Sequence, residues 1–227
     1  MVRGGNTPLL FAARVGNLTS AMLLLQAGAD VDQTAPSGNS ALVVAAHSGH
    51  GELAILLLEY GADANAATGG YTALHAAILH KDEELVEALL RHGATPDARL
   101  GTSTQVRRDS VDFYFHPSYV GATPYWLAAR FSAPAIMQQL AEHGADTRFV
   151  HRPRYRRGSL SVVKNPLVDE GDTTALMAAV GMGGRSPLLA VERFARIAEA
   201  APVGGRRDPD RTTHEAVTLE AVRLAIE

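Results

Sequence analysis

The chain has 227 residues, of which 46% are hydrophobic and 20% charged, and its formal net charge is −3 at pH 7. This composition is typical of a folded protein, and the absence of cysteine excludes disulfides, thiol catalysis and cysteine-ligated zinc. No apolar run approaches the roughly 18–20 residues that span a bilayer, and the slight acidity argues against a general nucleic-acid binder.

A short motif recurs along the chain and predicts its elements in order. It reads Thr-Pro-Leu-Leu-Phe-Ala-Ala at 7–13, Ser-Ala-Leu-Val-Val-Ala-Ala at 40–46 and Thr-Ala-Leu-His-Ala-Ala at 72–77, and returns at 123–129 and 174–179. The hydroxyl residue suits the N-cap of a short helix, and the Ala-Ala pair gives that helix a thin face for close packing. After each of the first four motifs, a second apolar helix is expected to end at a glycine, namely Gly28, Gly61, Gly93 and Gly144.

Successive motifs are 33, 32, 51 and 51 residues apart. This pattern resembles the ankyrin repeat, which has a period of about 33 residues and a Thr-Pro-Leu-His signature. The resemblance implies an all-α ankyrin-repeat solenoid of about five helix-turn-helix units with β-hairpin loops. We expect a single domain over 1–227, with repeats near 5–37, 38–69, 70–97, 121–147 and 171–227 and insertions near 98–120, 148–170 and 181–212.

Both ends of the predicted array lack a polar cap. Residues 220–227 align with 84–91 and keep apolar Val222, Leu224 and Ile226 on a last helix. Because a solenoid needs end repeats with a polar outer face, the pattern predicts that the chain is a fragment of a longer array. A cytoplasmic location is the default expectation, since no signal peptide precedes the first repeat. An exported location stays open if such a segment lies upstream.

The resemblance also implies a binding surface, because ankyrin proteins usually hold partners in the concave groove lined by hairpin tips and first helices. The matching positions follow the Ala-Ala pairs or precede the capping residues. The candidates for partner binding are Arg14, His47, Ser48, Tyr71, Leu79, His80, Arg130 and Phe131.

The first two insertions supply a second group of candidates. Residues 1–97 carry a net charge of −6 and residues 98–170 a net charge of +4, so a basic, aromatic lip is expected on an acidic body. Its candidate residues are Phe113, Tyr114, Phe115, Arg152, Arg154, Tyr155, Arg156 and Arg157. Long insertions are often functional. The aromatic run could equally fold down as a lid, and the arginines could be a solvated loop.

These patterns favour a non-enzymatic protein–protein interaction scaffold that acts as a monomer, with no cofactor, metal or membrane contact. His75 is expected to have a structural role. The partner would be another protein, and an acidic or phosphorylated surface would suit the arginines. Two alternatives remain: the recognition arm of a longer enzyme or effector, and polyanion or nucleic-acid binding through the arginine-rich loop. The acidic body disfavours nucleic acid.

Overall fold

The computed structural model describes residues 7–104, 115–152, 154–156, 167–169, 171–179, 219–224 and 226. The predicted insertion at 181–212 and the candidates Phe113, Tyr114 and Arg157 lie outside the described residues. Arg154, Tyr155 and Arg156 are described through their strand pairing alone.

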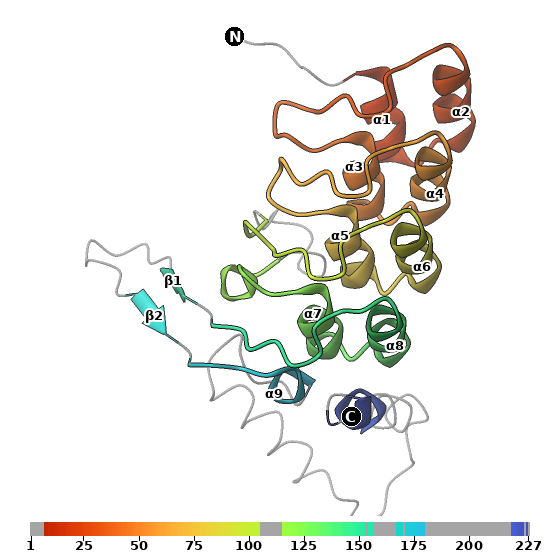
Figure 1. Ribbon diagram of the computed structural model, residues 1–227. Coiled ribbons are helices and arrows are strands. Elements are labelled where there is room, and N and C mark those ends of the chain that lie inside the picture. The colour runs from red at the N-terminus through yellow and green to blue at the C-terminus, as the bar shows by residue number, and fades with distance from the viewer. Residues whose placement is uncertain are drawn as a thin grey trace, which may run out of the picture.

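Short helices arranged in pairs form the framework of the described chain. The pairs are α1 (Pro8–Val15) with α2 (Leu18–Gln26), α3 (Ala41–His47) with α4 (Gly51–Glu59), α5 (Ala73–His80) with α6 (Glu83–Arg91), and α7 (Pro124–Arg130) with α8 (Pro134–Glu142). Figure 1 shows the first helices of the pairs stacked in one column and the second helices in a parallel column, with long loops extending from the first column. The predicted all-α solenoid is confirmed.

The helix boundaries follow from capping chemistry. The Thr7 hydroxyl accepts a hydrogen bond from the backbone N–H of Leu10 at 3.3 Å, and equivalent bonds form at Ser40, Thr72, Thr123 and Thr174. Such a cap stabilises a helix by about 1 kcal/mol. The glycines that follow the second helices, Gly28, Gly61, Gly93 and Gly144, have φ between 82° and 86°. The predicted starts and ends of the helices are therefore confirmed.

The hydrophobic core runs the length of the stack. The Ala-Ala pairs at 12–13, 45–46 and 128–129 are all buried, so adjacent first helices approach closely. From the second helices, Leu57, Leu89 and Leu140 are fully buried. Each repeat thus buries its apolar stripe against its neighbours, which is how a solenoid is stabilised.

The two described insertions add small elements of their own. The first contains a 3-10 turn, η1 (Pro117–Tyr119), directly before the fourth pair of helices. The second contains a two-stranded antiparallel ribbon in which β1 (Arg154–Arg156) pairs with β2 (Leu167–Asp169), with Arg154 opposite Asp169. The ribbon projects from the side of the array that carries the loops (Figure 1).

The stack continues beyond the fourth pair. Helix α9 (Ala175–Ala179) packs on α7 as α5 packs on α3, and residues 219–224 are helical. The Tyr125 hydroxyl donates to the carbonyl of Leu224 at 3.0 Å, and Ala221 is fully buried. We propose that α9 and residues 219–224 are the two helices of a fifth repeat.

Candidate functional site

Two of the candidate positions in the first two repeats lie open to solvent. Arg14 is at the end of α1 and Ser48 is at the C-cap of α3, and both are exposed. His47 is half-buried beside them. His80, one repeat further on, is also half-buried, and its Nε2 donates to the carbonyl of His47 at 2.9 Å. This part of the surface presents one arginine, a hydroxyl and two imidazoles.

The first insertion covers candidate positions in the third repeat. The ring of Phe115 is fully buried, and its centroid lies 5.5 Å from the ring of Tyr71 and 6.4 Å from the rings of both His47 and His75. Tyr71 and Leu79 are each only 7% exposed. A partner cannot reach these three side chains in this structure. The expectation that Phe115, Tyr71 and Leu79 contact a partner is therefore corrected: all three are buried core residues.

A second aromatic side chain from the same insertion lies over the fourth repeat. Tyr119 has its ring centroid 5.9 Å from that of Trp126 and 5.9 Å from that of Phe131, edge-on to the latter. The guanidinium of Arg130 lies 6.0 Å from the centroid of the Tyr119 ring. Arg130 and Phe131 are consequently half-buried rather than freely presented. The sequence left two interpretations of this insertion's aromatic side chains, a partner-binding surface or a lid folded down on the repeats. The described side chains, Phe115 and Tyr119, pack on the repeats as a lid would.

The second insertion is tied to the first. His151 is buried, and its Nε2 donates to the carbonyl of Ser118 at 2.7 Å. The guanidinium of Arg99 lies 4.4 Å above the ring centroid of Phe149, a cation–π contact across the two insertions. Arg152 is exposed, and its Nε lies 3.0 Å from a carboxylate oxygen of Asp172. The candidate arginine at 152 is therefore accessible but already paired with an acid.

Burial also sets the electrostatics of this region. Burial lowers the pKa of His75 to about 4, and the backbone of Ala98 opposes that shift. Burial raises the pKa of Tyr71, and the hydrogen bond with Asn39 opposes it. Both rings are therefore neutral at pH 7, which fits a structural role for His75 and not acid–base chemistry.

A chain of hydrogen bonds links the hairpin loops, and sequence reasoning missed it. Side-chain oxygens of Asp32, Asn65 and Asp97 accept from the backbone N–H groups of Asp63, Thr95 and Asp146 in the following repeat, at 2.8–2.9 Å. The sequence does contain a pattern that could have predicted these bonds, because each acceptor residue comes four positions after a helix-ending glycine. The fourth repeat has Arg148 at that position, which has no side-chain acceptor.

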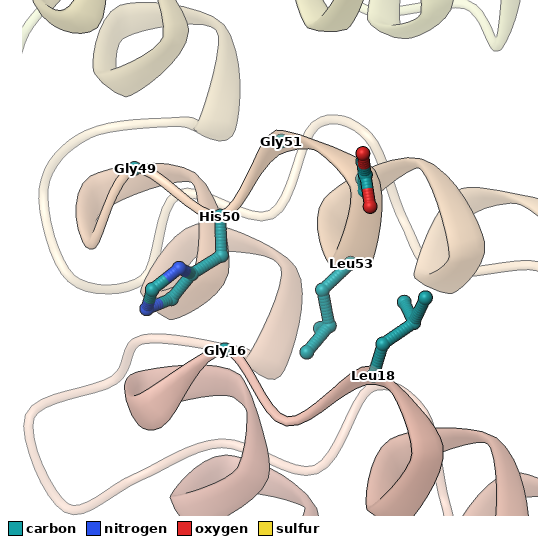
Figure 2. Close-up of a pocket in the computed structure, with 7 residues that line it drawn as sticks. Gly16, Leu18, Gly49, His50, Gly51 and Leu53 are labelled. Atoms are coloured by element: carbon teal, nitrogen blue, oxygen red, sulfur yellow. The ribbon is translucent and has the colours of Figure 1, made fainter.

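A hollow of about 280 Å³ lies between the helix-to-helix turns of the first two repeats, and Figure 2 shows the residues that line it. The ring of His50 lies toward Gly16, and Leu53 faces Leu18. The Nε2 of His50 is 3.2 Å from the Arg14 carbonyl, so this imidazole holds two repeats together. The hollow offers one imidazole and the carboxylate of Glu52 as ionisable side chains, too few for a metal or a catalytic triad. Within the described residues, no group of three or more histidines and acids could hold a metal ion.

None of the helices in the described part of the chain is long and apolar enough to cross a membrane. Residues 9–99 match the family model of ankyrin repeats in three copies. The chain contains ankyrin repeats. The matched segment covers α1 to α6, and the fourth pair of helices repeats the same caps and burial beyond it. A search of curated proteins gave no match.

Ankyrin repeats generally mediate protein–protein interaction and are typically non-catalytic modules. In this chain the first two repeats present the exposed candidates Arg14 and Ser48, whereas aromatic side chains of the first insertion pack over the third and fourth repeats.

Proposed function

We propose that this chain is a non-enzymatic interaction scaffold that binds another protein through two exposed areas. One is the concave side of the first two repeats, around Arg14 and Ser48. The other is the exposed edge of the second insertion, around Arg152. The observation that carries the proposal is the contrast in exposure: Phe115 and Tyr71 are buried, while Arg14, Ser48 and Arg152 are open to solvent.

Rigidity supports this assignment. The candidate side chains on the first two repeats project from helix ends that are fixed by caps, by the His80–His47 bond and by the buried Ala-Ala pairs. A rigid surface loses little conformational entropy on binding. The partner that suits the arginines is an acidic or phosphorylated protein. A cytoplasmic setting stays a prediction from the sequence.

Charge reversal tests the concave area. The variant Arg14→Glu/Ser48→Glu should lose its partner in a quantitative pull-down from the native lysate, because both changes place a carboxylate where the proposal needs a basic, hydrogen-bonding surface. Arg91→Glu is the matched control, since Arg91 is an exposed arginine on a second helix. A protein retained by the wild type and by Arg91→Glu but lost from the double variant supports the proposal. An identical set of bound proteins on all three baits contradicts it.

The insertion is tested with Arg152→Glu rather than with a deletion. Removing 148–157 would also remove the buried His151 and its bond to Ser118, so loss of binding could then reflect loss of structure. Tyr155→Ala/Arg156→Ala completes the test at the ribbon. If these substitutions leave partner binding unchanged, the insertion is not part of the interface.

A further inference from the structure

Residues 115–120 of the first insertion form a small unit of their own, which we call the lid. Its backbone hydrogen bonds are local: the N–H of Tyr119 donates to the carbonyl of His116 at 2.9 Å, and the N–H of Thr104 donates to the carbonyl of Phe115 at 3.2 Å. Among the described residues, no backbone–backbone hydrogen bond joins the lid to one of the α-helices. The position of the lid on the repeats therefore depends on side-chain contacts.

One of these contacts lies on candidate positions of the second and third repeats. The ring of Phe115 is fully buried and packs against the rings of Tyr71 and His47. Ser48, the residue after His47, stays exposed. The lid therefore borders the exposed part of the candidate surface, and lifting it would add the rings of Tyr71 and His47 to the area that Ser48 presents.

The second insertion supplies a hydrogen bond that holds the lid in place. The Nε2 of His151 donates to the carbonyl of Ser118 at 2.7 Å, and both residues are buried. His151 is itself fixed by two backbone hydrogen bonds with Thr173, each 2.8 Å long, and its ring centroid lies 4.6 Å from that of Trp126. The donor is thus anchored on the fourth repeat and on the segment that leads into α9, whereas the acceptor belongs to the lid.

This bond matters because its acceptor is shielded from water. A buried carbonyl that loses its donor is unfavourable, whereas the same carbonyl in a lifted lid can bond to water. Burial of the Phe115 ring favours the closed lid, so the open form is the minor one. A ligand that binds the open form better than the closed form would shift this balance.

We propose that His151 is a latch that keeps the lid closed, so that displacement of the second insertion uncovers Tyr71 and His47. Arg152 follows the latch directly in the chain and is exposed, so a partner bound at Arg152 would act on the latch. The role of Arg152 rests on the proposed function. The link between latch and lid does not.

The test is hydroxyl-radical footprinting of the full chain without any partner, read by mass spectrometry, which measures the solvent exposure of individual side chains. His151→Phe keeps a ring against Trp126 but removes the N–H donor. It should increase the oxidation rates of Phe115 and Tyr71 about tenfold, because loss of one hydrogen bond to a buried carbonyl shifts the lid equilibrium by roughly that factor. His143→Phe is the matched control, since His143 is an exposed histidine at the C-cap of α8, and it should match the wild type.

Buried leucines of the second helices, Leu57 and Leu89, serve as internal references and should stay protected in every variant. Unchanged protection of Phe115 and Tyr71 in a folded His151→Phe variant overturns the proposal. So does equal loss of protection at the reference leucines, because it would show general unfolding rather than an open lid.

Thr173→Val provides a second variant should His151→Phe lose its helices by circular dichroism. The Thr173 hydroxyl donates to the carbonyl of His151 at 3.3 Å, so its removal loosens the anchor of the latch and leaves the imidazole intact. The oxidation rates of Phe115 and Tyr71 should then rise about threefold, and no rise overturns the proposal. Because no partner is present, failure here is distinguishable from failure of the proposed partner surfaces in the pull-down.

Discussion

At the scale of single residues, His75 shows how the family signature is used in this chain. Its Nδ1 accepts from the backbone N–H of Thr72 at 3.2 Å and lies 2.8 Å from the Thr72 hydroxyl, closing a reciprocal cap at the start of α5. With Nδ1 as an acceptor, the proton of the neutral ring is on Nε2. Phe115 lies edge-on to the same ring, so water does not reach it.

This arrangement makes stability depend on pH. The pKa of His75 is about 4 in the folded chain against an ordinary value of 6.5, so the unfolded chain binds the proton more tightly. The free energy of unfolding should therefore fall as pH drops from about 6.5 to about 4, by up to roughly 3 kcal/mol, and should gain nothing from this group above that range. Urea unfolding at several pH values measures it. His75→Gln should flatten the dependence, and an unchanged slope in that variant would assign the effect to other groups.

At the scale of elements, the turn between the paired helices shows both regularity and a departure from it. Gly16 and Gly49 have φ of 72° and 78°, which glycine adopts without strain. The third repeat has Lys81 at the equivalent turn, and it keeps the same left-handed conformation with φ of 56°. The geometry of the turn is thus preserved although its residue type is not.

Lys81→Gly should therefore stabilise the third repeat. A residue with a Cβ in the left-handed conformation is strained by about 1–2 kcal/mol, and the glycine variant would be free of this strain. Glycine also raises the conformational entropy of the unfolded chain, which offsets part of the stabilisation. We expect a net increase of about 0.5–1 kcal/mol in the free energy of unfolding, measured by urea denaturation. The reverse change, Gly16→Ala, should destabilise, because its Cβ would lie 2.6 Å from the ring of His50 at a positive φ. Equal stability of Lys81→Gly and the wild type would contradict this account.

Among the elements, the repeated helices could be predicted from the sequence, whereas the packing of the insertions could not. Helix starts, helix ends and the buried leucines follow from local capping and from a repeated spacing, so each repeat predicts the next. The first insertion occurs once and has no counterpart to compare with. Nothing in its local sequence tells whether Phe115 points to solvent or to Tyr71. Arg99 and Phe149 likewise come together only because the two insertions meet in space.

At the scale of the whole molecule, the insertions change how the solenoid holds together. In a plain array each repeat contacts only its neighbours, so stability is a sum of local terms. Here Phe115 contacts His47 of the second repeat and Tyr71 of the third, and Asp97 reaches across the insertion to Asp146. The third and fourth repeats therefore stay coupled although 51 residues separate their motifs.

Removing one ring tests that coupling. Phe115→Ala should lower the free energy of unfolding by about 3–5 kcal/mol, as expected for a fully buried phenylalanine. Phe11→Ala is the matched control, because the same side chain is removed at a position that is 63% exposed, and it should change stability by no more than about 0.5 kcal/mol. Denaturation followed by circular dichroism measures both. Similar losses in the two variants would show that Phe115 is not seated in the core.

Trp126 gives the molecule a built-in optical reporter. It is the only tryptophan of the chain, it is fully buried, and its ring is contacted by Tyr119 from the first insertion and by His151 from the second, 4.6 Å between centroids for the latter. Its emission therefore senses both insertions at once, without any added dye. Displacement of either insertion, by a partner or by a substitution, would shift the wavelength of a single intrinsic fluorophore, so the seating of the insertions can be followed in unlabelled protein in real time.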